Sequence, residues 1–290
     1  TANSSDPFLN TTVDGRVLLS WTEKPNPNEQ GRNAFLAQLD SQGVPFALRR
    51  INDIDGHVHW YGGDNRLKFS TAPDGTVTSL WQAPMAKEFK ISNVYYASAA
   101  SDGPFAASSV LNDDDNDPPV AHAFSTVETA PNGKVYATWI DGRNRTFEGM
   151  GEVKSTEERR ADIKMRDLTI PEFAMKSGPR PQRSFTEPNS QLFMAVSEDG
   201  GKTFGENYPI TNIQVCACCA PNIAFLDGGE KVIVSYRNVT DKSLRDNVII
   251  RSTDGGKTFS EPQYFSEDGW IARFCPHAGP SMISDAEGNL

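Results

Sequence analysis

The sequence predicts an all-β fold, a β-propeller built from four-stranded antiparallel blades, and two observations favour it. The first is a recurring strand that ends in an aromatic residue and follows an Asp-Gly or Asn-Gly turn: RVLLSW at 16–21, TVTSLW at 76–81, KVYATW at 134–139 and KVIVSY at 231–236. The second is the spacing of the turn glycines, which is 60 residues from Gly15 to Gly75 and 58 from Gly75 to Gly133. Such turns between alternating segments predict hairpins, and a fixed period of four strands predicts propeller blades.

The repeat predicts one domain over residues 1–290, with blades at about 1–52, 53–112, 113–212 and 213–265. Residues 266–290 are expected to begin a fifth blade with the strand SMISDA at 281–286, and six blades are expected in a complete ring. The interval from Gly133 to Gly229 is 96 residues, which indicates an insertion at about 144–190 between the second and third strands of blade 3. A long insertion of this kind is typical of a lid or of a docking site for a protein partner.

Composition narrows the classes of partner and location. The 290 residues include 28 Lys+Arg and 38 Asp+Glu, a net charge of −10, which argues against nucleic acid and anionic membrane surfaces as partners. No apolar run reaches the roughly 18 to 20 residues of a transmembrane helix. The chain begins Thr1-Ala2-Asn3 without Met, as a mature exported chain or a trimmed one does. Its acidic composition, rich in Asn, Asp and Gly, favours a periplasmic or extracellular protein.

Two segments share a specific motif, SEDGGKTF at 197–204 and STDGGKTF at 252–259. Both fit Ser-x-Asp-x-Gly-x-Thr-aromatic, which resembles the Asp-box of the bacterial-neuraminidase repeat found in sialidases and sialidase-like propellers. The resemblance implies that the motif is structural. Its polar side chains would hydrogen-bond the turn between the third and fourth strands, and its Gly would permit positive φ. The motif residues are Ser197, Asp199, Gly201, Thr203, Ser252, Asp254, Gly256 and Thr258.

The resemblance also implies what a sialidase would need. Enzymes of that family hold the substrate carboxylate with three arginines, the first of them in an Arg-Ile-Pro stretch on the first blade, and use a Tyr–Glu nucleophile and an Asp acid/base. The matching stretch here, SSDPFLNTT at 4–12, has no Arg, which predicts a family member that is not a sialidase. Asp141, Arg143 and Arg237 are candidate catalytic residues, and ion pairs at the rim are their alternative role. A glycan-acting hydrolase or a carbohydrate-binding module therefore stays open as an alternative function.

The cysteines and histidines form the other candidate site. In a propeller, the first strand of each blade is the innermost and lines a central channel. All eight residues come just before such a strand, so the topology predicts that they lie at one mouth of this channel, on the face opposite the Asp-box turns. Thiolate and imidazole are ligands for copper and zinc, and we expect copper first and zinc second. The predicted ligands are Cys216, Cys218, Cys219, Cys275 and His277, with His57, His59 and His122 as weaker candidates.

Two interpretations of the cysteines remain open. On an extended segment, Cys216 and Cys218 would face one way and Cys219 the other, which predicts a metal site from Cys216, Cys218, Cys275 and His277. In an oxidising compartment, a disulfide between Cys275 and one of the other three would instead join blades 4 and 5. The corresponding functions are a metal-binding or assembly protein and a disulfide-stapled structural subunit of a larger complex.

A weaker calcium site is predicted in the acidic stretch NDDDNDPP. Asp113, Asp115 and Asp117 alternate there, and carboxylates spaced by two can bind Ca²⁺. A solvated acidic loop is the alternative interpretation.

Overall fold

The computed structural model describes residues 4–26, 31–59, 65–84, 92–114, 120–144, 190–212, 214–240, 244–272, 277–285 and 287–290. These residues form the strands β1 to β16 and one short 3-10 turn at Asp227–Gly229. A membrane-spanning helix, long and apolar enough to cross a bilayer, is not found among them.

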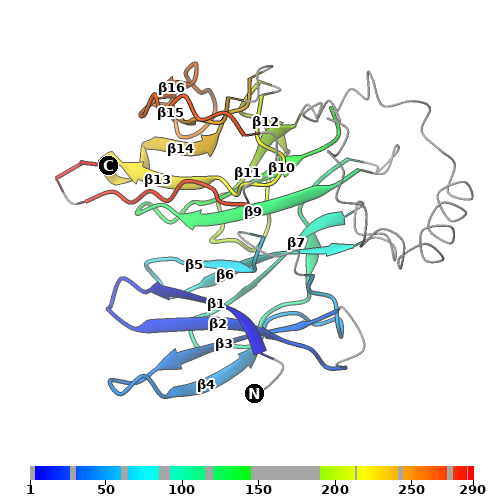
Figure 1. Ribbon diagram of the computed structural model, residues 1–290. Coiled ribbons are helices and arrows are strands. Elements are labelled where there is room, and N and C mark those ends of the chain that lie inside the picture. Colours follow the sequence, from blue (N-terminus) through cyan, green and yellow to red (C-terminus); the bar gives the residue numbers. More distant parts are fainter. Residues whose placement is uncertain are drawn as a thin grey trace, which may run out of the picture.

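The strands form four antiparallel sheets in chain order (Figure 1). The first contains β1 (Ser4–Thr11), β2 (Val17–Glu23), β3 (Asn33–Leu39) and β4 (Pro45–Arg50). The second contains β5 (Lys68–Thr71), β6 (Val77–Pro84), β7 (Ser92–Ala99) and β8 (Ser109–Val110). The third contains β9 (His122–Thr129), β10 (Val135–Asp141), β11 (Gln191–Ser197) and β12 (Tyr208–Pro209). The fourth contains β13 (Asn222–Leu226), β14 (Lys231–Arg237), β15 (Asn247–Ser252) and β16 (Gln263–Tyr264).

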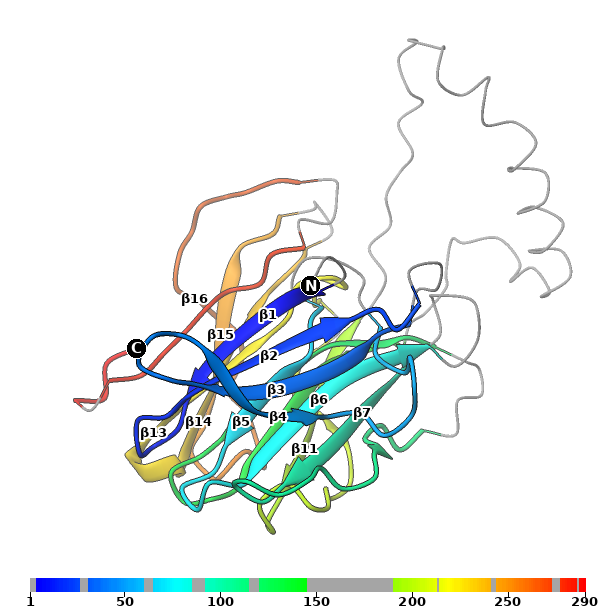
Figure 2. The same cartoon turned by 90° about the horizontal axis from the view of Figure 1, so that it is seen from below.

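Figures 1 and 2 show the four sheets lying side by side as consecutive blades. Apolar side chains from facing sheets form one core at each junction. Leu36 and Phe69 belong to the core between blades 1 and 2, Leu80 and Trp139 to the next, and Tyr136 with the fourth-blade strands to the last. The predicted fold class, an all-β propeller with four-stranded antiparallel blades, is confirmed.

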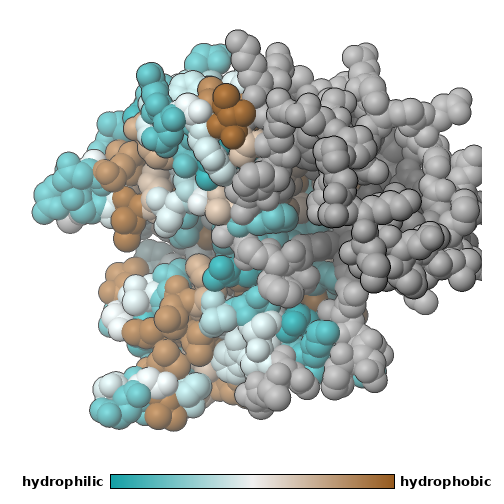
Figure 3. All heavy atoms as spheres, in the orientation of Figure 1, coloured by the Kyte–Doolittle hydropathy of each residue, from teal (hydrophilic) through white to brown (hydrophobic). Residues whose placement is uncertain are grey.

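Burial along the second strand of each blade follows from how many of its faces are covered. β10 lies between two other blades, and all seven of its residues are buried. β2 is covered on one face only, so its buried residues alternate with half-buried ones, among them Leu19 and Trp21. Several large apolar side chains of this first blade are exposed, including Leu9 and Leu48, and Figure 3 shows hydrophobic surface over the part of the molecule where β1 to β4 lie.

The strand expected at 281–286 is not formed in the residues that the structure describes. Residues 277–285 have no regular secondary structure, and Figure 1 shows this stretch running past β9 and β13. Its first part is held by close contacts instead: the Ala278 carbonyl accepts hydrogen bonds from Arg237, and a Cβ on Gly279 would lie 2.0 Å from the Ala220 carbonyl oxygen. A strand requires hydrogen bonds to a neighbouring strand, and no described strand pairs with this segment.

The two turns at 197–204 and 252–259, here called the DGG turns, have the same internal hydrogen bonds. In the first, the Ser197 hydroxyl donates to Asp199 Oδ1 at 2.7 Å and accepts from the Gly201 N–H at 2.8 Å. Asp199 also accepts from the Thr203 N–H and hydroxyl at 2.9 and 2.6 Å. The second turn repeats these bonds from 252 to 258. Burial alone would raise the pKa of Asp199, but the bonds from Thr203 and Ser197 lower it to about 2.

Each DGG turn packs against the second strand of the preceding blade. Gly201 has φ +86°, and a Cβ there would lie 1.9 Å from Thr78 Oγ1. Gly256 has φ +90°, and a Cβ there would lie 3.0 Å from Tyr136 Cε1. The Tyr136 hydroxyl also donates to the Gly255 carbonyl at 3.1 Å. The turns therefore need Gly for the backbone conformation and for close approach to the preceding blade.

Candidate functional site

Three cysteines gather at one end of the junction between blades 3 and 4. Cys216, Cys218 and Cys219, here called the thiol cluster, lie in the connection from β12 to β13, and all three side chains are buried. The preceding Val215 bridges to Ser190 before β11 and to Asn238 after β14. The Cys216 N–H donates to the Arg237 carbonyl at 2.9 Å. These backbone contacts fix the start of the cluster against both blades.

The three sulfur atoms of the thiol cluster converge. The Sγ atom of Cys216 lies 3.7 Å from that of Cys218 and 3.4 Å from that of Cys219, and all three lie within 4.8 Å of one another. The predicted orientation of Cys219 away from the other two was therefore wrong. Residues 217–219 form a turn and not an extended segment, so the two-residue alternation of a strand does not apply to them.

The cysteines differ in their covalent state. Cys218 is disulfide-bonded, whereas Cys216 and Cys219 are free thiols. The hydrogen bond with Cys216 and the positive charge of Arg237 lower the pKa of Cys219 to about 7, although burial opposes this. The same hydrogen bond, together with burial, raises the pKa of Cys216. The pair therefore holds one proton between its sulfurs when the first proton has been lost.

Two arginines surround the free thiols. The Arg245 side chain is fully buried, and its Nη1 donates to Cys216 Sγ at 3.1 Å while its Nε donates to the Ala272 carbonyl at 2.7 Å. Arg237 donates to the Arg245 carbonyl at 2.6 Å and to Ala278. Both cations are thus held in place by backbone carbonyls, next to sulfurs that can carry negative charge.

The predicted histidines lie at the same end of their blades as the thiol cluster. The His59 N–H donates to the Gln82 carbonyl near the end of β6, and His122 pairs with Asp141 at the end of β10. Cys216 has the equivalent contact with Arg237 at the end of β14. His57 packs edge-on against the ring of Tyr95, 4.5 Å between centroids.

The histidines do not join the thiol cluster in a common set of ligands. Among the described residues, Cys216, Cys218 and Cys219 are the one group of three or more His, Cys, Asp or Glu side chains whose ligand atoms lie within 4.8 Å of one another. His277 is exposed, with its ring 6.1 Å from that of Phe124. Cys275 lies outside the described residues.

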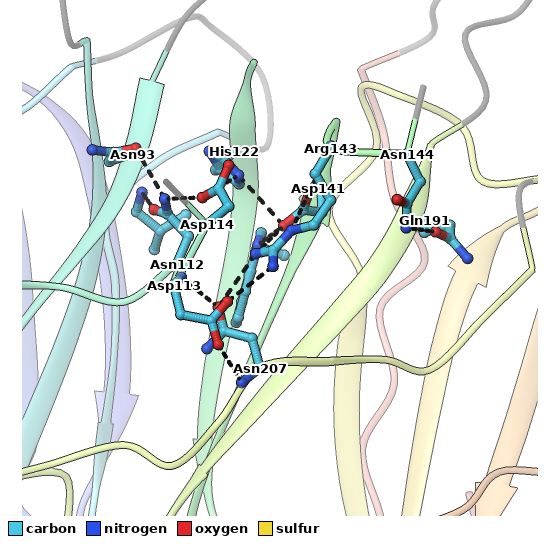
Figure 4. A network of polar contacts seen from close by, with 12 residues as sticks. Asn93, Asn112, Asp113, Asp114, His122, Asp141, Arg143, Asn144, Gln191 and Asn207 are labelled. Atoms are coloured by element: carbon cyan, nitrogen blue, oxygen red, sulfur yellow. Dashed lines mark hydrogen bonds and ion pairs between the residues drawn. The ribbon is translucent and has the colours of Figure 1, made fainter. Parts of the chain in front are cut away.

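Asp141 and Arg143, two of the candidate catalytic residues, are paired with each other (Figure 4). The Asp141 side chain is 0% exposed and accepts hydrogen bonds from the Trp139 indole at 2.8 Å and from the Arg143 backbone N–H at 2.8 Å. The Arg143 guanidinium lies 3.0 Å from Asp141 Oδ2 and stacks over Phe193 at 4.3 Å. Burial alone would lower the pKa of Arg143, but the bond to Asp141 raises it. This arrangement fits a structural ion pair.

His122 connects this pair to the loop that follows β8. Its Nδ1–H donates to the Ser92 carbonyl at 2.9 Å, and its Nε2 lies 3.2 Å from Asp114 Oδ1 and 3.5 Å from Asp141 Oδ2. Burial would raise the pKa of Asp114, but hydrogen bonds from His122 and Asn112 lower it to about 2. His122 therefore has polar partners of its own, away from the thiol cluster.

The predicted calcium ligand Asp113 is already engaged. Its carboxylate accepts from Arg143 Nη1 at 2.9 Å and from the Asn207 backbone N–H at 2.9 Å. Asp115 and Asp117 lie outside the described residues, as does most of the blade 3 insertion, at 145–189.

Sequence reasoning missed Arg245 and Asn207. Arg245 precedes β15 and returns to the thiol cluster only because the chain folds back after β14. Asn207 precedes β12 and closes a reciprocal pair of hydrogen bonds with Asp113. The signal for Arg245 is weak: it is an arginine followed by an acidic residue, Asp246, just before an apolar strand.

Comparison with known proteins identifies structures with a similar fold but no family to which the chain belongs. No protein-family model matches the chain, and no curated protein sequence matches it. A protein of unknown function from Dyadobacter fermentans is similar in structure, with a TM-score of 0.52, 12% identity, and 90% of this chain and 69% of that chain covered.

Two further solved structures are less similar. The GH93 α-L-arabinofuranosidase of Fusarium graminearum has a TM-score of 0.49 and 12% identity over 88% of this chain and 64% of its own. The parainfluenza virus 5 hemagglutinin-neuraminidase ectodomain has a TM-score of 0.48 and 12% identity over 90% of this chain and 56% of its own. The chain thus spans less than two thirds of these two proteins.

Proposed function

We propose that this propeller binds a soft metal ion, copper first and zinc second, through the thiolates of Cys216 and Cys219. The observation that supports the proposal is the pair of buried free thiols with sulfurs 3.4 Å apart, beside a third sulfur within 4.8 Å. Thiolate sulfur is the protein ligand that soft ions prefer. Two sulfurs bonded at about 2.3 Å to one ion are about 3.8 Å apart when the ion is tetrahedral and about 4.6 Å apart when it is two-coordinate and linear, so the pair must open by between about 0.4 and about 1.2 Å from its 3.4 Å separation.

The electrostatic surroundings favour the thiolate form that metal binding requires. Cys219 has a pKa of about 7, because of its bond with Cys216 and the nearby Arg237 charge. Arg245 donates an N–H to Cys216 Sγ, and such outer hydrogen bonds orient and tune metal ligands. The site can therefore lose its first proton near neutral pH, and an incoming ion displaces the second from Cys216, whose pKa is raised.

The other interpretation of the cysteines, a disulfide that joins blades 4 and 5, is compatible with this metal site. Cys218 is disulfide-bonded and neither Cys216 nor Cys219 is its partner, so we propose Cys275, the remaining cysteine of the chain, as that partner. A disulfide at Cys218 leaves the other two thiols available for an ion. Peptide mapping under non-reducing conditions would detect the Cys218–Cys275 pair, and a Cys216–Cys219 disulfide in its place would contradict both proposals.

We further propose that the chain is an exported sialidase-like propeller of the Asp-box family that does not hydrolyse sialosides. The repeated hydrogen bonds of the two DGG turns support the family. The ion pair between Asp141 and Arg143 engages these two groups with each other, which supports a structural role for them. A sialyl or arabinosyl reporter hydrolysed by the wild type and not by Arg143→Ala would contradict this.

The metal proposal is tested by titrating the protein anaerobically with Cu(I), without a disulfide reductant, so that the disulfide at Cys218 stays formed. We expect about one ion per chain in the wild type and loss of binding in Cys216→Ser and in Cys219→Ser. The matched control is the double variant Cys218→Ser, Cys275→Ser, which removes the proposed staple and leaves both ligands. Binding that survives in Cys216→Ser and Cys219→Ser would refute the assignment of ligands.

A further inference from the structure

We infer that Arg245 and Arg237 make the thiol cluster selective for the monovalent ion Cu(I) over the divalent ion Zn(II). The inference rests on the proposed function, because it concerns which ion the two thiolates accept. Three features of the site lead to it: the number of ligands, the burial of both sulfurs, and the fixed positive charge.

The number of ligands favours Cu(I). Cys218 is in a disulfide, so among the described cysteines Cys216 and Cys219 are the two able to act as thiolates. Cu(I) is a soft ion that forms two-coordinate dithiolate complexes, whereas Zn(II) in proteins takes four ligands. No His, Asp or Glu side chain among the described residues lies in one ligand group with these sulfurs.

The burial of both sulfurs disfavours water as a further ligand of a zinc ion. Cys216 is 0% exposed and Cys219 is 1% exposed, and both belong to the apolar core between blades 3 and 4. A Zn(II) ion bound to two thiolates would need two further ligands in that core. Cu(I) would need none.

The fixed positive charge of the two arginines also favours Cu(I) over Zn(II). Arg245 Nη1 lies 3.1 Å from Cys216 Sγ, so an ion bonded to that sulfur at about 2.3 Å lies within about 5.4 Å of a guanidinium nitrogen. Arg237, whose guanidinium donates to the Arg245 and Ala278 carbonyls, adds a second positive charge on the same side of the site. A cation of charge +2 is repelled twice as strongly as one of charge +1 at the same place. The dithiolate complex of Cu(I) carries a net negative charge, which the arginines stabilise.

The guanidinium positions are fixed by the backbone and do not depend on an ion. Arg245 Nε donates to the Ala272 carbonyl, and Arg237 donates to the Arg245 and Ala278 carbonyls. Neither side chain can turn away from a bound dication without losing these bonds. The repulsion is therefore built into the site.

The experiment compares Cu(I) and Zn(II) affinities, each measured against a competing chelator, in the wild type, Arg245→Gln and Arg245→Lys. The readout is the ratio of the two affinities, because the cost of deprotonating the thiols is common to both ions and cancels. We expect the ratio to fall by about tenfold or more in Arg245→Gln, since one unit charge near the ion is removed. Arg245→Lys keeps the charge and should keep the ratio close to that of the wild type.

The outcomes separate the two proposals. If the wild type binds neither ion, the proposed function fails. If the wild type binds Cu(I) but the ratio is the same in Arg245→Gln, or falls equally in Arg245→Lys, the charge-selection inference is refuted. Should buried Arg245→Gln fail to fold, as judged by circular dichroism, the part-exposed Arg237→Gln decides in the same way, again by the change in the ratio.

Discussion

The contact between the first DGG turn and blade 2 predicts a large effect of one methyl group. Gly201→Ala places a Cβ at φ +86°, and that atom would lie 1.9 Å from Thr78 Oγ1 and 2.9 Å from Thr78 Cβ and Cγ2. The left-handed backbone costs Ala about 1 kcal/mol, and overpacking costs about 1 to 3 kcal/mol more. We expect the free energy of unfolding to fall by about 2 to 4 kcal/mol.

The neighbouring glycine is a matched control for backbone strain. Gly200 has φ +75°, and a Cβ there meets nothing within 4 Å, so Gly200→Ala should cost only the backbone strain, about 1 kcal/mol. Both variants would be measured by urea unfolding at equal slope. Thr78→Ala removes the closest atom and should recover part of the loss in Gly201→Ala. Equal destabilisation by Gly200→Ala and Gly201→Ala would refute the reasoning, because it would show that the turn does not pack against blade 2.

Three further predictions concern single polar groups. Tyr136→Phe removes the hydroxyl that donates to the Gly255 carbonyl and should cost about 1 kcal/mol of unfolding free energy, measured by urea unfolding; no change would contradict the contact. Asp141→Asn removes the buried charge that pairs with Arg143 and should cost about 3 kcal/mol or more, and a loss below 1 kcal/mol would show that the pair is solvated. Asp199 has a lowered pKa, so its contribution to stability is present above the unfolded pKa of about 4 and is lost as pH falls toward 2. Asp199→Asn should flatten the pH dependence of stability in that window, and an unchanged pH profile would contradict the turn's hydrogen bonds.

The fold could be predicted from the sequence because its signals are local. Strands such as 134–139 follow an Asn-Gly turn and end in an aromatic residue, and each such strand is the second of a blade in the structure. The DGG turns likewise follow from residue types, since Ser, Asp, Gly and Thr each satisfy one backbone requirement.

The geometry of the thiol cluster could not be predicted in the same way. The sequence places Cys216, Cys218 and Cys219 together, but whether Cys219 faces the others depends on the turn at 217–219, which no Gly or Pro marks. Arg245 lies 29 residues from Cys216 in the chain and contacts it through tertiary packing, which the residues next to Arg245 signal only weakly. The prediction of a strand at 281–286 was wrong for a related reason, because a strand needs a neighbouring strand to pair with and the local sequence pattern does not specify one.

The ion pair of Asp141 and Arg143 shows the same limit for the candidate catalytic residues. Their types and their position at a strand end are what a propeller hydrolase would use, and the sequence alone leaves both roles open. The structure shows the Trp139 indole, the Arg143 backbone and the guanidinium all bonded to one carboxylate. Whether these three groups all reach the Asp141 carboxylate depends on side-chain orientation, which residue spacing does not reveal.

The measurement that tests the central claim most directly is metal content together with a free-thiol count on one sample of untagged protein. The account predicts two titratable thiols per chain in the metal-free protein, and about one copper ion per chain when copper is supplied, with both thiols then protected from alkylation. Protein that has no free thiols and takes up no metal would contradict the account, because Cys216 and Cys219 would then form a disulfide and not an ion site.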